Sequence, residues 1–542
     1  MRFKFTISRL LIFILLTGSS GVTAQQIINS GNPGDTIRTI HIIQGKSLRY
    51  ITIDSLTVLE TIAGNAIIRE GLTTFYCDSA SVNRKTNILE AFGKIHINDN
   101  DSIHTYAQNL RYIGADRIAH LTKNVKLTDK KGTLYTDELE YNLRTGIATY
   151  KNGGRITNEK TVLTSKDGVY YADTKDVYFK KDVHLKDPDR DIWTDSLLYN
   201  LKTNIATFIS QTHIVGKDGT IIDTKSGTYN LETGEAIFYD RTSFSDSTRS
   251  GVADRIAYDK KTEIMQMEGN AKLVDSVNKV TVLANQIFAN GKLNSFLATR
   301  KPVMILYRDG DSTYIAGDTL FSGLRKYDSL ERKVLTQLDT LKTTTFVTAN
   351  DKDTAIRYFL AFHHVRIFND SLQAVSDSLH YSTSDSTFKL FGEPVVWNDK
   401  SQITGDTMYM YTENQKPKRL YVFNDGMIVN KSNDSMYNQI AGRTINGFFT
   451  DGKLDSVRAK GSPAESIYYT LDEDSAYIGM NRSSSDVIDV YFVNKELNKV
   501  AFRNAVDGVM YPIHQIPGDK KRLIGFKWLD SRRPKNKLEL FE

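Results

Sequence analysis

A ten-residue pattern recurs along the first half of this chain at an almost constant spacing. The stretches YNLRTGIATY, YNLKTNIATF and YNLETGEAIF begin at Tyr141, Tyr199 and Tyr229. Aligning the chain on the first residue of the pattern gives positions spaced 28 to 30 residues apart: Val82, Tyr112, Tyr141, Tyr171, Tyr199, Tyr229, Tyr258 and Phe288. Self-similarity at a fixed period is typical of stacked supersecondary units. We therefore expect an elongated array of repeats.

Each unit reads as two β-hairpins. In the recurring stretch, a strand ending in Tyr is followed by a turn such as NLRTG and a second strand such as IATY, and Asn, Asp and Gly are typical of such turns. Residues 212–224 read as the second hairpin of one unit. The chain has 9 prolines against 28 tyrosines and 25 phenylalanines, which suits paired strands. The sequence therefore predicts an all-β fold of antiparallel hairpins, with about four short strands per unit.

The second strand of each unit has an apolar face. Side chains alternate along a strand, so the residues seven and nine positions after the aligned residue share a face. In several units the first of these is small and the second large, whereas Thr149 and Thr207 stand between them. This stripe consists of Leu121, Ala148, Tyr150, Ala206, Phe208, Ala236, Phe238, Met265 and Met267. The unit aligned on Tyr171 departs, with Tyr178 and Lys180 at the equivalent positions. The stripe fits either the closed interior of a β-solenoid or the lining of a groove.

The regular pattern ends near residue 300. We expect regular repeats over residues 25–300 and a second, less regular β segment over 301–465. A charged excursion at 325–353 lacks the period of two and reads as a loop or short helix. Residues 466–542 are expected to form a C-terminal β segment with a basic, partly extended tail.

The first residues, 1–24, read as a secretory signal peptide. A basic start (Arg2, Lys4, Arg9) precedes an apolar run at 10–16. The small residues of the sequence VTA then fit a cleavage site before Gln25. The apolar run is too short for a membrane span, and no later stretch has the roughly 18 apolar residues that a spanning helix needs. The mature chain is therefore expected to be exported.

Charge and cysteine content exclude two classes of protein. Loss of the three basic signal residues would lower the formal charge from +6 to +3, which argues against a nucleic-acid binder. Cys77 is the only cysteine, so an intrachain disulfide framework cannot hold the fold.

No catalytic motif is present among the common nucleophile-elbow, zinc, phosphate-loop and dinucleotide patterns. Cys77 is interpreted as a half-buried strand residue rather than a nucleophile. His363 and His364 have no third metal ligand beside them in the sequence, and neighbours on a strand point to opposite faces. The run DPDRD (187–191) begins like a calcium loop, but Ile192 stands where Gly is needed. Acidic residues are therefore assigned to solvated turns, and no enzyme activity, metal or cofactor is expected.

With its spacing D-x-L-x-Y…T-x-x-A and its exported start, the chain resembles the OstA-like family, over residues 57–296. That family includes the lipopolysaccharide-transport proteins LptA and LptC and the N-terminal domain of LptD. Three further stretches, at 465–481, 490–502 and 522–534, are similar to the long OstA-like proteins of Bacteroidetes.

The resemblance implies an open, twisted β-jellyroll, or β-taco, of two facing sheets whose apolar groove shields lipid A acyl chains. The stripe residues would line that groove. It also implies a periplasmic protein that bridges transport to the outer membrane. Such a protein would associate end to end with itself or with related OstA-like domains, and with inner- and outer-membrane transport components. The alternatives are an exported structural β-solenoid, acting as an adhesin or scaffold with a closed core, and a carbohydrate-binding module with exposed aromatic platforms.

Overall fold

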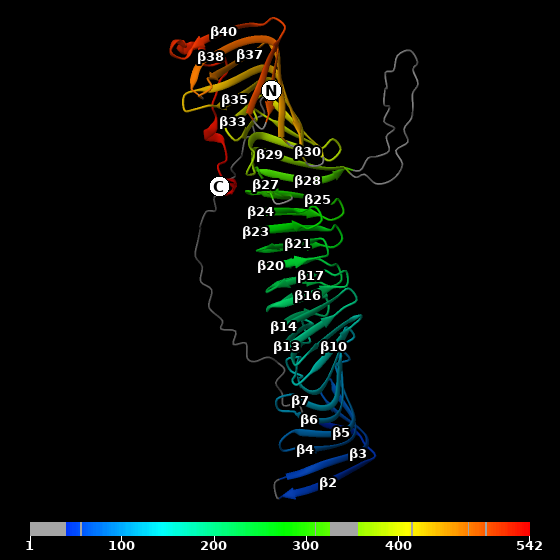
Figure 1. Cartoon of the computed structure of the whole chain (residues 1–542). Helices are drawn as coiled ribbons and strands as arrows, with labels where there is room; N and C mark the ends of the chain where they lie inside the picture. The colour runs from blue at the N-terminus through cyan, green and yellow to red at the C-terminus, as the bar shows by residue number, and fades with distance from the viewer. Residues whose placement is uncertain are drawn as a thin grey trace, which may run out of the picture.

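The computed structural model is a long, narrow stack of antiparallel strands that run across its long axis (Figure 1). It describes residues 40–541 except 55–56, 309–310, 326–355, 414–415, 452, 475 and 494–495. The hairpins follow one another in chain order from β2 (Ser47–Asp54), in blue, to β40 (Asp507–Pro512), in red. The predicted all-β fold of antiparallel hairpins is confirmed. The predicted signal peptide and all but the first residue of the predicted charged excursion lie outside the described residues.

Many strands bend in the middle and so contribute to two facing walls. In β5 (Ile88–Asp99), Gly93 and Lys94 take positive φ angles of 74° and 43°. There the pairing with β6 (Ile103–Ile113) shifts its register between Phe92 and Ile95. Similar kinks recur at Gly64–Asn65, Lys123–Asn124, Lys181–Asp182, Gly269–Asn270, His363–His364 and Asn424–Asp425. We call the wall that holds 88–92 and its equivalents the tyrosine wall, and the wall that holds 95–99 and its equivalents the acid wall.

The strands fall into three groups by the wall they join. Strands that cross both walls are β3 (Thr57–Glu70), β4 (Thr73–Asn83), β5, β6, β7 (Ile118–Thr128), β8 (Thr133–Asn142), β13 (Asp176–Lys186), β14 (Arg190–Asn200), β23 (Ile264–Asp275), β24 (Val280–Asn290), β29 (Ile356–Phe368), β30 (Gln373–Ser382), β35 (Lys416–Lys431), β36 (Tyr437–Thr450), β37 (Lys453–Leu471) and β38 (Tyr477–Val493). Strands of the tyrosine wall alone are β2, β9 (Ile147–Tyr150), β12 (Asp167–Tyr171), β15 (Ile205–Phe208), β18 (Gly227–Asn230), β19 (Ala236–Phe238), β22 (Arg255–Asp259), β25 (Ser295–Thr299), β28 (Thr319–Arg325), β31 (Thr387–Phe391), β34 (Thr407–Glu413) and β39 (Glu496–Arg503). Strands of the acid wall alone are β1 (His41–Gln44), β10 (Gly154–Asn158), β11 (Thr161–Ser165), β16 (Thr212–Gly216), β17 (Ile221–Thr224), β20 (Thr242–Ser245), β21 (Arg249–Ala253), β26 (Val303–Arg308), β27 (Asp311–Ala316), β32 (Val395–Asn398), β33 (Ser401–Thr404) and β40.

The two walls bury an apolar core between them. Along β14, Ile192 of the acid wall and Leu197 and Tyr199 of the tyrosine wall are fully buried. Burial of a large apolar side chain stabilises a fold by roughly 1.5–3 kcal/mol. The ring of Tyr150 fits because Gly154 and Gly168 lie against it, where an added Cβ would stand 2.2 and 2.3 Å from ring carbons.

The unit that was aligned on Tyr171 fits the repeat one residue earlier than the sequence alignment placed it. Tyr170, rather than Tyr171, pairs with Ala148 on the inner face, whereas Tyr171 is 39% exposed. The small-then-large positions are therefore Val177 and Phe179, both fully buried. Tyr178 and Lys180 point outward, so the apparent departure of this unit was wrong and came from the choice between two adjacent tyrosines.

Strand pairing continues across residue 300. On the acid wall β24 pairs with β26, and on the tyrosine wall β25 pairs with β28. The domain boundaries at residues 300 and 465 stay predictions.

The C-terminal segment, residues 513–541, folds back along the outer face of the acid wall, in red beside β33 in Figure 1. We call it the strap. The sequence predicted a basic, partly extended tail; the strap instead includes four short 3-10 helices: η1 (Ile513–Gln515), η2 (Gly518–Lys520), η3 (Asp530–Arg532) and η4 (Lys537–Leu540). Its leucines Leu523, Leu529 and Leu540 pack on apolar residues of the acid wall that face away from the core.

Buried glutamines of the acid wall hold the strap backbone. The side-chain oxygen of Gln439 accepts a hydrogen bond from the Leu523 N–H at 2.8 Å. In the same way Gln402 accepts one from the Leu529 N–H at 2.7 Å. Each glutamine also donates to a strap carbonyl, so both ends of each buried amide are satisfied.

The two ends of the stack carry edge strands. Among the described residues, β2 pairs with β3 alone and β39 with β38 alone. On β2, Leu48, Tyr50 and Ile53 are 46%, 66% and 60% exposed. A strand with an unpaired edge is a template for pairing with another chain. Across the described residues, no helix is long and apolar enough to cross a membrane.

Candidate functional site

Two rows of inner-face residues run the length of the tyrosine wall. The floor row lies next to the bends and includes Leu110, Leu121, Leu139, Tyr150, Phe179, Leu197, Phe208, Phe238, Ile256, Met267, Ile287, Ala298 and Leu320. The mouth row lies two residues further from the bends and includes Tyr112, Ala119, Tyr141, Ala148, Tyr170, Val177, Tyr199, Ala206, Tyr229, Ala236, Tyr258, Met265, Ala289, Phe296, Phe359, Tyr381, Phe388 and Met410. Both rows are continuous in strand register.

The nine residues of the predicted stripe all lie in these two rows. The large members Leu121, Tyr150, Phe208, Phe238 and Met267 stand in the floor row, and the small members Ala148, Ala206 and Ala236, with Met265, stand in the mouth row. All nine are buried except Met265, which is partly exposed. The predicted sharing of one inner face is therefore confirmed. Their contact with a lipid stays a prediction.

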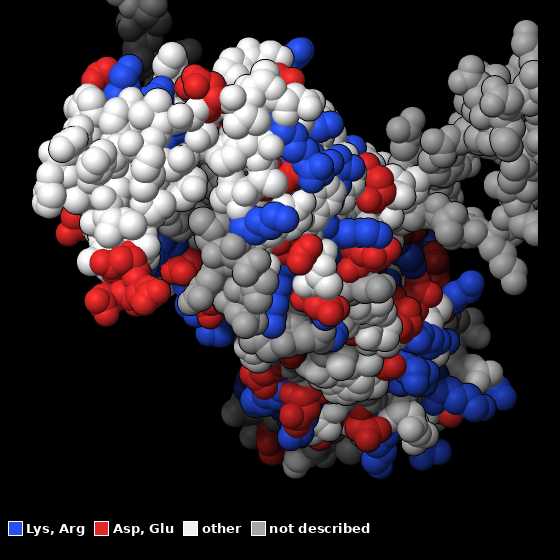
Figure 2. All heavy atoms as spheres, turned by 45° about the horizontal axis from the view of Figure 1, so that its top comes forward, with Lys and Arg blue, Asp and Glu red and all other residues white. Residues whose placement is uncertain are grey.

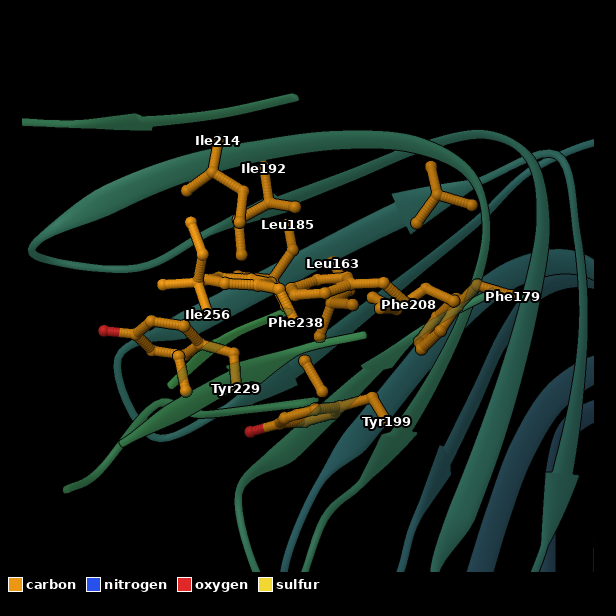
Figure 3. Close-up of a cluster of buried hydrophobic side chains, with 14 of the residues drawn as sticks. Leu163, Phe179, Leu185, Ile192, Tyr199, Phe208, Ile214, Tyr229, Phe238 and Ile256 are labelled. Carbon is orange, nitrogen blue, oxygen red and sulfur yellow. The ribbon is translucent and has the colours of Figure 1, made fainter. Parts of the chain in front are cut away.

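Over the first repeats the two walls are closed on each other. The mouth row is buried from Tyr112 to Ala236. Figure 3 shows Phe208 and Phe238 side by side within this core, with Ile192 and Ile214 on one side of them. The two phenylalanine rings stack with centroids 6.4 Å apart. We call residues 62–208 of this closed part the stem.

Hydrogen bonds cross the mouth of the stem from wall to wall. The Tyr141 hydroxyl donates to Asp99 Oδ2 at 2.9 Å, and Tyr112 and Tyr170 donate in the same way to Glu70 and Asp129. A fourth contact joins Tyr199 to the Asn158 amide, which donates to the tyrosine oxygen at 3.3 Å. The partners in the four pairs are 42, 42, 41 and 41 residues apart in the chain. We call these pairs the rungs.

Burial and charge set the chemistry of the rungs. Burial raises the pKa of the Tyr112, Tyr141 and Tyr170 hydroxyls, so they remain protonated donors. For Asp129, burial alone would raise the pKa, but hydrogen bonds from Tyr170, Lys175 and backbone N–H groups outweigh it and lower the pKa. A hydrogen bond to a charged group contributes roughly 1.5–3 kcal/mol. The rungs therefore hold the edges of the two walls together at every second strand.

The series of rungs ends near residue 190. At the fifth position, Asp187 accepts hydrogen bonds from N–H groups of its own turn, at Asp189 and Arg190. The predicted turn at DPDRD is present, but Asp187 is buried rather than solvated. The Arg190 guanidinium lies over the Tyr229 ring, 4.1 Å from its centroid. At the sixth position, 42 residues before Tyr258, stands Gly216, which has no side chain with which to accept a hydrogen bond.

An apolar groove begins where the rungs end. One cavity of about 610 Å³ lies between Ile214, Tyr229, Phe238 and Met265, and a second of about 550 Å³ lies between Met265, Phe296, Phe359 and Phe388. Both cavities are lined by Arg249, Met265 and Ala289, so they adjoin. The mouth row is partly exposed here, at Met265, Ala289, Phe296, Tyr381, Phe388 and Met410. From Tyr258 to Met410 this open section spans roughly 40 Å, at about 4.8 Å per strand.

Charged residues stand at the rim of the groove. Lys260 of the tyrosine wall pairs with Asp189 of the acid wall at 2.6 Å. Arg249 lies on the acid wall beside Asp246, and Arg357 lies at the far cavity. The arrangement is an apolar channel with ions of both signs along its edges. Figure 2 shows Lys and Arg mixed with Asp and Glu over much of the face in view, beside a largely uncharged area at the upper left.

The candidate nucleophile Cys77 and the candidate metal ligands His363 and His364 lie apart from this groove. Cys77 is buried, and burial followed by the nearby Asp78 charge raises its pKa to about 11, so the thiol is protonated at neutral pH. His363 and His364 occupy an exposed bend and pair with Asp377 and Asp318 at 3.1 and 2.9 Å. Within the described residues, no three His, Cys, Asp or Glu side chains are placed to hold a metal ion.

Sequence reasoning missed the acid side of the rungs. Glu70, Asp99, Asp129 and Asn158 each stand at the end of an acid-wall strand. The three acidic residues were read as solvated turn residues, and Asn158 was not singled out. Their spacing of 29 to 30 residues repeats that of the tyrosines, with an offset of 41 or 42 residues. This second period was the signal that could have revealed them.

Two family models and a solved structure match parts of the chain. Residues 40–195 match the family model of OstA-like proteins, and residues 163–294 match that of the LptA/LptD N-terminal-domain lipopolysaccharide transport proteins. Together the two matches span residues 40–294. The crystal structure of LptH from Pseudomonas aeruginosa, the LptA-homologous periplasmic component of its lipopolysaccharide transport device, matches 26% of this chain and 95% of its own length, at 16% identity and a TM-score of 0.21. No curated protein matches the chain.

Proposed function

We propose that this OstA-like chain is a non-enzymatic periplasmic protein that binds lipopolysaccharide, shields its acyl chains and bridges transport to the outer membrane. The observation that carries the proposal is the apolar groove between the walls, where mouth-row residues such as Met265 and Phe296 remain partly exposed. Each methylene kept out of water contributes roughly 0.8 kcal/mol. A continuous apolar channel is therefore what carriage of an acyl chain through an aqueous compartment requires.

Photo-crosslinking tests the proposal. A photoreactive residue at Phe296, on the inner face of β25, is expected to capture lipopolysaccharide during expression in a lipopolysaccharide-producing cell. The matched position is Leu297, next on the strand and facing outward. Capture from Phe296 but not Leu297 supports the proposal. Equal capture from both faces, or none from either, contradicts it.

The edge strands support end-to-end assembly as part of the same proposal. β2 at one end and β39 at the other offer unpaired edges, and the exposed apolar side chains of β2 would be covered by a second copy or by a related OstA-like domain. Components in the inner and outer membranes are the expected partners at the ends of such an assembly. Sedimentation at increasing concentration should show association that weakens when Tyr50 and Ile53 are both changed to Lys. A strict monomer that binds no related domain contradicts this part.

A structural scaffold with a closed core is the second candidate, because the stem is closed. It predicts that the groove beyond Gly216 takes no lipid, and the crosslinking experiment separates the two functions.

A further inference from the structure

The closed and open sections of the molecule differ in one repeated feature. Both sections carry the same apolar floor row, which is buried from Leu110 to Leu320. The stem has rungs across its mouth, at Tyr112, Tyr141, Tyr170 and Tyr199. In the open section the mouth row passes through Met265, Ala289 and Phe296, which carry no hydroxyl group, and through Tyr258 and Tyr381, which form no rung among the described residues. The rungs end one repeat before the mouth row opens: Tyr229 and Ala236 are still buried, and the Arg190 guanidinium lies over the Tyr229 ring in place of a rung.

The rungs occupy equivalent places on the acid wall. Glu70, Asp99, Asp129 and Asn158 are each the last inner-face residue before the turn of an acid-wall hairpin. Gly216 takes this place in β16, because it pairs with Arg190, which in turn lies opposite Asp187. Tyr258 supplies the donor that the sixth rung would need, but Gly216 supplies no acceptor.

We infer that the rungs are a latch which seals the stem, and that the missing acceptor at Gly216 sets the point from which the groove is open to an apolar ligand. This inference rests on the proposed function for the nature of the ligand, a long acyl chain. In a sealed stem, Leu121, Ala148, Tyr150, Ala206 and Phe208 pack the core. Of the stripe residues, those at the start of the groove, Ala236, Phe238 and Met265, would contact the acyl chain.

Gly216 allows a gain-of-latch experiment. Gly216→Asn would copy the fourth rung, in which an asparagine faces a tyrosine. Its Cβ would meet the end of the Asp218 side chain, 2.4 Å from Oδ1, which can rotate away. Gly216→Ala is the matched control, because it makes the same steric demand without a polar group. A long-chain fluorescent fatty acid serves as the probe, and amide hydrogen exchange reports on the walls independently of any ligand.

The expected result for Gly216→Asn is at least threefold weaker binding of the fatty acid and slower exchange around Tyr258. Gly216→Ala should match the wild type. In the opposite direction, Tyr112→Phe/Tyr141→Phe/Tyr170→Phe should raise exchange at the mouth of the stem at least tenfold and add fatty-acid binding there. The single variant Tyr141→Phe replaces the triple variant if the latter does not fold, with faster exchange expected in the hairpins beside it.

Identical behaviour of Gly216→Asn and Gly216→Ala in both measurements overturns the latch, as does unchanged exchange in the tyrosine variants. If the fatty acid binds none of the proteins, the proposed function fails while the exchange measurements still decide the latch.

Discussion

The Tyr141 hydroxyl and the Asp99 carboxylate form a hydrogen bond across the mouth of the fold at 2.9 Å, although 42 residues separate them in the chain. The bond joins the tyrosine wall of one repeat to the acid wall of a neighbouring one. It therefore stabilises the closed form of the stem through contacts that no single hairpin contains.

Removal of the Tyr141 hydroxyl should destabilise the stem. Tyr141→Phe keeps the ring in the core but leaves the Asp99 carboxylate with one partner fewer, at an expected cost of about 1–3 kcal/mol. Chemical denaturation followed by circular dichroism measures the change. Tyr171→Phe, on the exposed face of β12, two strands further along the tyrosine wall, is the control and should stay within about 0.5 kcal/mol of the wild type. If the two changes lower the stability equally, the rung does not contribute to the stability of the stem.

The Asp129 rung should make stability depend on acid pH. The carboxylate accepts hydrogen bonds from Tyr170 and from the Gly132 N–H and pairs with Lys175 at 2.9 Å, and its pKa is lowered in the folded state. Its contribution is therefore complete above the ordinary carboxyl pKa of about 3.9 and is lost as the pH falls through the lower folded value. Thermal unfolding of the wild type and Asp129→Asn should differ most near neutral pH and converge at strongly acid pH. A constant difference would refute this assignment.

A charge at Phe208 should disrupt folding. The side chain is 1% exposed, so Phe208→Asp would bury a carboxylate without a partner and cost several kcal/mol. Thr207→Asp, on the opposite face of the same strand, should have little effect. The midpoint of thermal unfolding distinguishes them. A folded Phe208→Asp protein as stable as Thr207→Asp would mean that the stem is open in solution.

A charge in the groove should affect ligand binding instead. Phe296 is partly exposed on the mouth row, so the carboxylate of Phe296→Asp can stay hydrated and stability should fall by less than about 1 kcal/mol. Lipopolysaccharide binding should weaken at least tenfold, because the apolar lining is interrupted. Displacement of a fluorescent lipid measures binding, with Leu297→Asp as the control. Loss of folding in Phe296→Asp, or unchanged binding, would contradict a lipid path at this position.

Cys77 should react slowly in the folded protein. Its pKa of about 11 leaves little thiolate at neutral pH, and burial restricts access. Iodoacetamide labelling followed by mass spectrometry should therefore be much faster in denaturant than in buffer. The triple variant Cys77→Ala/His363→Ala/His364→Ala should bind lipopolysaccharide within a few-fold of the wild type. Complete loss of binding would instead give these residues a functional role.

The sequence was informative about what every repeat shares. A period of 28 to 30 residues was enough to predict the hairpins and the inner face on which Ala206 and Phe208 lie, because alternation along a strand is a local property. The adjacent pair Tyr170 and Tyr171 was assigned wrongly, because either residue fits a period of that width.

The rungs and the point of opening depend on which repeats face one another. Periodicity shows that Asp99 and Tyr141 recur, but not that the turn of one unit lies against a strand of another. The apolar stripe also continues from Phe208 to Met267, so the pattern alone cannot place the boundary at Gly216. The strap was missed for a similar reason, since its contact at Gln402 is made by Leu529, 127 residues away.

The strap also imposes an order on how the molecule is completed. Trp397 and Val429 are fully buried on the outer face of the acid wall, and the residues that cover this face, among them Leu529 and Leu523, are synthesised after it. Until they arrive, that part of the wall carries apolar surface on both sides, a form of intermediate that is prone to aggregate. The repeats of the stem can close as they are synthesised. The section that the strap covers keeps exposed apolar surface until the strap has folded back over it.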